Sequence, residues 1–148
     1  MNDHPNYHDG EEETGHIETG VESSVIWRWT AIAAAVSLIV NLILYFVGVA
    51  NDWIPDDMPA ATDAFNLVTV ILASVIPVVV FGALMVYLAN HAPRASRLFE
   101  IILLVVLIVA VMVPFTLPDI DDSFRYVLVA MHIVTASTIL LLTRLPEN

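Results

Sequence analysis

Three polar residues lie at positions in this 148-residue sequence where side chains can do chemistry inside an apolar environment. Asn41, Ser74 and His132 each fall near the middle of a separate long apolar run. An ionisable residue at such a place is first of all a functional candidate, because imidazole carries protons and binds ligands. Asn and Ser offer hydrogen bonds that tie apolar helices together. Two interpretations of His132 therefore stay open: a structural contact between helices, or proton and ligand handling.

The usual catalytic and cofactor-binding patterns are absent from the sequence. It contains no HExxH, GxSxG, GxGxxG or Walker motif and no pair of acids within an apolar run. Because it has neither cysteine nor lysine, thiol chemistry, iron–sulfur clusters and Schiff-base enzymes are excluded. A haem between two histidines needs a second one at the depth of His132, which only another subunit could supply. We therefore expect no catalytic residue, metal or cofactor, and a protein that is not an enzyme.

The elements that position these side chains are four apolar runs, each close to the roughly 20 residues that cross about 30 Å of hydrocarbon. They cover about residues 26–49, 65–89, 98–117 and 124–143. Only 14% of the residues are charged and 58% are hydrophobic, whereas soluble domains carry about 25% charged residues. The sequence predicts an all-α fold, in which residues 25–148 form a bundle of four transmembrane helices.

Depth along these spans predicts a midplane polar cluster. At 1.5 Å per residue, Asn41, Ser74 and His132 share a level to within about 3 Å, so they meet if spans one, two and four pack together. Small and polar residues form one stripe on span one, which is the face we expect it to turn to its neighbours. Residues 101–113 of span three contain no polar side chain. That span is predicted to be the most lipid-exposed, or to face a partner protein.

The first 24 residues form a separate region, with seven acids, three glycines and no base. Such a composition cannot bury enough apolar surface to order the chain, so we predict a disordered acidic tail. His4, His8 and His16 in it are better explained as incidental than as a metal site. The net charge of −11 also argues against nucleic acid as a partner.

Arginine placement predicts the orientation of the chain in the cell membrane. The loops 51–63 and 118–123 hold seven acids and no base. If the spans alternate, four arginines fall on the opposite side, namely Arg28, Arg94, Arg97 and Arg144. The positive-inside rule then places both termini in the cytoplasm.

Two charged contacts are predicted at the ends of the spans. Arg97 and Glu100 are three residues apart, which favours an interfacial ion pair. Arg125 is the one arginine predicted to lie at the same end of the spans as the acidic loops. It is within one helical turn of Asp121 and Asp122 and can pair with either.

Four motifs together carry a resemblance: AAAVSLIVNLILYFVG in span one, a proline in span two, VMVPF in span three and VLVAMHIVTA in span four. On the basis of these motifs, the chain resembles, over about residues 29–145, an uncharacterised family of four-helix bacterial and archaeal membrane proteins, catalogued as a domain of unknown function. The resemblance implies the four-helix fold and recurrent positions at Asn41 and His132, but no activity. The acidic, lysine-free composition also resembles that of proteins from salt-loving microbes, where charge keeps surfaces soluble, although GC-rich coding depletes lysine equally.

We expect a small non-enzymatic membrane protein that lies in the lipid bilayer and acts by packing against a membrane-protein partner or a second copy of itself. The short loops, the absence of a catalytic set and the bare apolar third span support this function. The alternative is a small transporter or proton-linked protein that uses His132. An enzyme of lipids or quinones has no motif in its favour.

Overall fold

The computed structural model describes residues 23–54 and 65–144, and these form helices without any strand. The elements are α1 (Ser23–Ala50), α2 (Leu67–His91), α3 (Ala95–Thr116), α4 (Asp122–Leu140) and the 3₁₀ turn η1 (Leu141–Arg144). All four long helices have the length and composition to cross a membrane. The predicted all-α bundle of four spans is confirmed. The predicted disordered tail lies outside the described residues, except that its last two residues begin α1.

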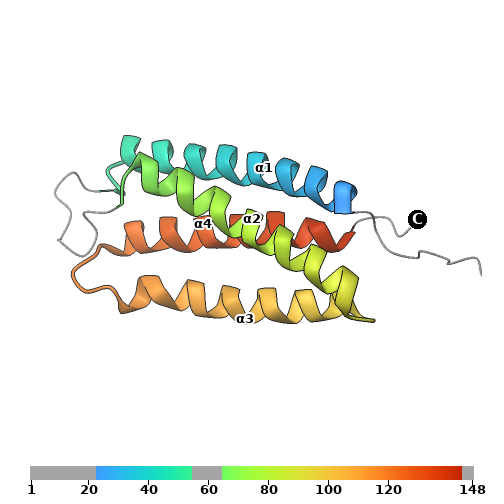
Figure 1. Cartoon of the computed structure of the whole chain (residues 1–148). Coiled ribbons are helices and arrows are strands. Elements are labelled where there is room, and N and C mark those ends of the chain that lie inside the picture. Colours follow the sequence, from blue (N-terminus) through green and yellow to red (C-terminus); the bar gives the residue numbers. More distant parts are fainter. Residues whose placement is uncertain (1–22, 55–64, 145–148) are drawn as a thin grey trace, which may run out of the picture.

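The helices are arranged in a layer of three with the fourth laid across it (Figure 1). α4 lies between α1 and α3, and it contacts both of them. α2 crosses this layer obliquely, from beside α1 at one end of the bundle to beside α3 at the other. The described chain therefore begins and ends at the same end of the bundle, where the turn between α2 and α3 also lies. The oblique path of α2 matters for the site, since it separates α2 from α3 over part of their length.

Buried side chains follow the helices in steps of three and four residues, the spacing by which packed helices keep one face toward their neighbours. On α4 the buried series includes Phe124, Val127, Met131 and Thr135. On α1 the predicted polar stripe is confirmed, because the residues buried there are mostly small or polar: Ile26, Thr30, Ala33, Ser37, Asn41 and Gly48. Helices in lipid approach closely through such residues.

Two glycines differ in how rigid the side chain is that covers each of them. A Cβ atom at Gly82 of α2 would lie 2.4 Å from Thr30 Oγ1 of α1, and that hydroxyl is held by donating to the Ile26 carbonyl at 2.8 Å. A Cβ atom at Gly48 of α1 would lie 2.7 Å from Ile54 Cδ1, the end of a flexible side chain, and at an ordinary contact distance of 3.7 Å from Val127 Cγ2. Gly82 thus allows α1 and α2 to cross closely, whereas Gly48 has a neighbour that can move.

The third helix is the least buried. Within the apolar stretch of each helix, 17% of the residues of α3 are buried, against 22–28% in the other three. Its exposed aliphatic side chains surround most of the helix, among them Ile101, Leu104, Val105, Ile108 and Val109. Its low burial fits both predicted surroundings of span three, lipid and a partner protein.

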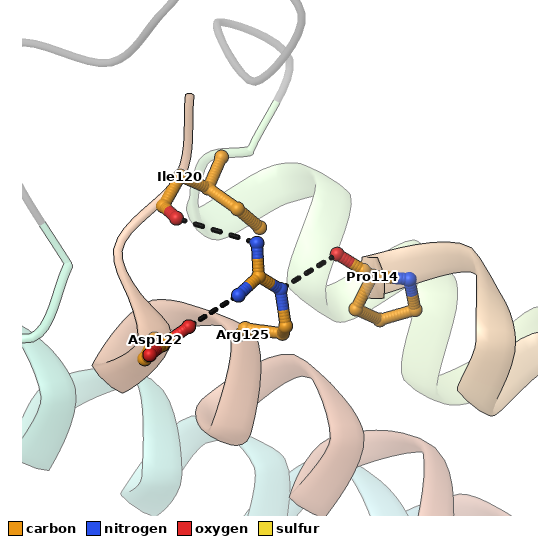
Figure 2. A network of polar contacts seen from close by, with 4 residues as sticks. All are labelled: Pro114, Ile120, Asp122 and Arg125. Carbon is orange, nitrogen blue, oxygen red and sulfur yellow. Dashed lines mark hydrogen bonds and ion pairs between the residues drawn. The ribbon is translucent and has the colours of Figure 1, made fainter. Parts of the chain in front are cut away.

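Arg125 caps the C-terminal end of α3 (Figure 2). Its Nε donates to the Pro114 carbonyl at 3.2 Å and its Nη2 to the Ile120 carbonyl at 3.5 Å, and Nη1 pairs with the Asp122 carboxylate. Carbonyls in the last turn of a helix lack intrahelical donors and carry partial negative charge, which favours a cation there. Of its two predicted partners, Arg125 pairs with Asp122. The cap explains why one arginine lies at the acidic end of the bundle.

Candidate functional site

The side chain of Asn41 connects three helices at the centre of the bundle. Its Nδ2 donates to Ser74 Oγ on α2 at 2.9 Å and to Thr135 Oγ1 on α4 at 3.0 Å. Ser37 Oγ, one turn before Asn41 on α1, lies 3.2 Å from Thr135 Oγ1. All four residues are at most 9% exposed. The structure thus brings Asn41 and Ser74 together at the level where the sequence places them, and we call these four residues the polar cluster.

His132 does not take part in the polar cluster, and Thr135 occupies the place predicted for it. The reason is the rotation of α4, whose inward series runs through Met131 and Thr135. His132 follows Met131 by one residue, which turns its side chain about 100° away around the helix. It is partly buried there, and its Nδ1 lies 2.7 Å from the Leu128 carbonyl of its own helix. Depth alone therefore misidentified the third member of the cluster.

Ser74 determines the orientation of the Asn41 amide. Ser74 Oγ donates its single proton to the Val70 carbonyl at 2.7 Å, so in its contact with Asn41 it must accept. The two Nδ2 protons of Asn41 are then used by Ser74 and Thr135. Asn41 Oδ1 is left as a buried side-chain atom with no hydrogen-bond partner among the described residues. A buried unpaired acceptor costs about 1–3 kcal/mol, so a bound donor would be favoured at this atom.

A groove of about 360 Å³ lies beside the polar cluster, between α2, α3 and α4. Most of its wall is apolar, with Phe81 from α2, Leu103 and Ala110 from α3 and Met131 from α4. Its polar lining consists of Asn41, Thr69, Ser74, His132 and Thr135. Among the described residues, no three His, Asp or Glu side chains come close enough to hold a metal ion. The groove is therefore suited to an apolar molecule that carries few polar groups.

The groove opens on the surface of the bundle at mid-span. Val106 of α3 and Ala73 of α2 line it and are both exposed. These residues lie well inside apolar helices that are long enough to cross a membrane. In a bilayer, such a mouth faces hydrocarbon rather than water.

Two further acceptors line this groove. A carbonyl only accepts, so the contact with Leu128 requires the proton on Nδ1 of His132, and in the neutral ring Nε2 then carries a lone pair. Nε2 has no partner among the described residues. On α2, Pro77 has no N–H and cannot bond the carbonyl of Ala73, one turn earlier. Both Ala73 and Pro77 line the groove with His132.

The predicted ion pair between Arg97 and Glu100 does not form in the structure. The pair found in the described parts of the chain is Arg125 with Asp122. Arg97 and Glu100 are both exposed in the first turns of α3. At an exposed position two charges interact with solvent about as well as with each other, so little free energy favours the pair.

The groove itself was not foreseen from the sequence, and neither was the role of Thr135. A signal for Thr135 existed, because it continues the polar face of span four one turn after His132. For the groove there was none, since it depends on the oblique path of α2 over the other three helices.

Comparison with known proteins gives a family but no activity. A model described as a family of unknown function (DUF6069) matches residues 21–146. Neither the curated proteins nor the solved structures give a match.

Proposed function

Since the chain belongs to a family of unknown function, we propose a function from its geometry: it is a non-enzymatic membrane protein that binds a small lipid-soluble molecule. The observation that carries the proposal is the groove of about 360 Å³ beside the polar cluster. Small-molecule sites typically combine mostly apolar walls with a few convergent polar groups, at volumes of about 300–1,000 Å³. The molecule would enter sideways from the bilayer, through the mouth at Val106.

Proton-linked transport through His132 is less well supported. Such a path needs water or a chain of titratable groups between His132 and one membrane face. The groove has mainly apolar walls, and its lining includes no Asp, Glu, Lys or Arg. The histidine is placed to contact a bound molecule rather than to relay protons.

Packing against a partner or a second copy remains a second proposal, and the exposed aliphatic surface of α3 favours it. In lipid such a surface gains little by leaving hydrocarbon, so a partner must offer close packing. Mass measurement of the protein in mild detergent tests this role. A strictly monomeric species without a partner contradicts it.

A pair of variants on α3 tests the binding proposal. Ala110→Phe fills the groove, whereas Val109→Phe places the same ring on the exposed side of the same helix. The proteins are purified in lipid nanodiscs from native membranes, and the small molecules retained with each are identified by mass spectrometry. We expect a stoichiometric molecule in the unmodified protein and in Val109→Phe that is lost in Ala110→Phe. The same molecules in all three samples would overturn the proposal.

A further inference from the structure

We infer that the molecule bound in the groove is a hydrogen-bond donor, namely an apolar compound with a hydroxyl group, such as a long-chain alcohol or an alkylphenol. The inference rests on the proposed binding function and adds the chemical class of the ligand. It disfavours ketones, ethers and esters of the same shape, because these offer only acceptors.

The first reason is the set of acceptors that the polar cluster and the groove leave without protons. Asn41 is 2% exposed and lines the groove, yet within residues 23–54 and 65–144 its Oδ1 has no hydrogen-bond partner. His132 Nε2 is a second acceptor in the neutral ring. The Ala73 carbonyl is a third, because Pro77, one turn later, has no N–H to donate to it. A ligand hydroxyl could satisfy one of these acceptors. Asn41 Oδ1 is fully covered by its neighbours, so a hydroxyl reaches that atom only if those neighbours move.

The second reason is that the donor protons of Asn41, Ser74 and His132 are already used. Both amide protons of Asn41 go to Ser74 and Thr135. Ser74 gives its own proton to the Val70 carbonyl, and His132 gives its Nδ1 proton to a carbonyl of its own helix. A ligand carbonyl next to these groups would have only acceptor atoms opposite it, with no proton to form a hydrogen bond. The cost of leaving polar groups unpaired makes such sites discriminate strongly between donor and acceptor ligands.

The third reason is the shape of the groove. Its volume equals that of about a dozen water molecules, which accommodates an aromatic ring with part of an alkyl chain. Apolar side chains from α2, α3 and α4 would surround the body of the molecule, including Phe81, Leu103 and Met131. The rest of the chain would extend through the mouth at Val106 into lipid.

Two probes test the inference, 4-octylphenol and its methyl ether 4-octylanisole, which share the ring and the alkyl chain but differ in the donor. Each is titrated into the detergent-solubilised protein, and the dissociation constant is taken from the rise in unfolding temperature. We expect the phenol to bind at least about tenfold more tightly than the ether, the effect of one hydrogen bond to a buried acceptor. Equal binding, or a preference for the ether, overturns the inference.

Variants locate the acceptor and separate this inference from the proposed function. His132→Phe keeps a ring but removes Nε2, and Asn41→Leu removes Oδ1. A third variant, Pro77→Ala, restores an N–H donor to the Ala73 carbonyl. The preference for the phenol should fall toward one in at least one of the three variants, and a preference that survives in all of them contradicts the inference. If Asn41→Leu fails to fold, the comparison of the two probes on the unmodified protein decides. If the two probes bind equally and Ala110→Phe abolishes the binding of both, only the donor requirement is refuted. If Ala110→Phe leaves their binding unchanged, the groove is refuted as the binding site.

Discussion

Replacing Thr135 by valine should destabilise the bundle, although valine keeps nearly the same shape. The hydroxyl of Thr135 accepts from Asn41 at 3.0 Å and lies 3.2 Å from the Ser37 hydroxyl, so it links α4 to α1 twice. Hydrogen bonds between membrane helices contribute about 0.6 kcal/mol each on average and at most about 1.7 kcal/mol. The two contacts thus predict a loss of about 1.2 kcal/mol, and no more than about 3.4 kcal/mol.

A matched control is available on the same helix. Thr138 is also buried, at 6% exposure, but its hydroxyl donates to the Thr135 carbonyl within α4. That bond lies within α4 and persists when the helices come apart without unfolding, so Thr138→Val should destabilise the bundle less than Thr135→Val does. The free energy of unfolding is measured by titrating sodium dodecyl sulfate into the detergent-solubilised protein, with near-ultraviolet circular dichroism as the signal.

A double-mutant cycle completes the test by pairing Thr135→Val with Asn41→Leu. If the two residues interact as the structure shows, their effects are not additive and the coupling energy is about 0.5 kcal/mol or more. Equal losses in Thr135→Val and Thr138→Val, or additive effects in the cycle, would refute the reasoning about the polar cluster. A larger loss in His132→Phe than in Thr135→Val would restore the histidine as the third member.

Three further predictions concern the frame around the site. Gly82→Ala should cost roughly 1–3 kcal/mol by overpacking, because its Cβ would lie 2.4 Å from the hydroxyl on α1, while Gly48→Ala, whose neighbour is flexible, should cost less in the same titration. Arg125→Gln should cost about 1 kcal/mol through the lost cap of α3, and a loss that disappears in high salt would assign the effect to its exposed ion pair instead. For orientation, single cysteines in place of Asn2 and Met58 should react with an impermeant thiol reagent in intact cells only at Met58, and labelling at Asn2 alone would reverse the proposed topology.

Much of the fold could be predicted because it depends on local properties of the chain. A run of about 20 apolar residues is long enough to span hydrocarbon wherever it occurs, and the four observed helices begin and end within a few residues of the predicted runs. The burial of the small and polar stripe on α1 follows from helical periodicity alone. The low burial of α3 follows in the same way from its uniform apolar composition.

The site could be predicted only in part, because it depends on how each helix is turned toward the others. Counting residues gives the depth of a side chain, since each residue adds 1.5 Å, and this places Asn41 and Ser74 at one level. The direction of a side chain around its helix depends on which neighbours pack against it. Because of the rotation of α4, Thr135 rather than His132 contacts Asn41, and His132 lines the groove.

The sequence by itself determined that this is a chain of four apolar helices with a polar level near their middle, because length, composition and periodicity are properties of each segment alone. The tertiary structure decided which polar atoms find partners and where the bundle stays open. The close contact of Gly82 with Thr30 brings α2 against α1, and the oblique path of α2 leaves a groove toward α3 that no single helix encodes. Packing of side chains from several helices sets such crossings, so the groove and the unpaired oxygen of Asn41 appear only once all four helices are in place.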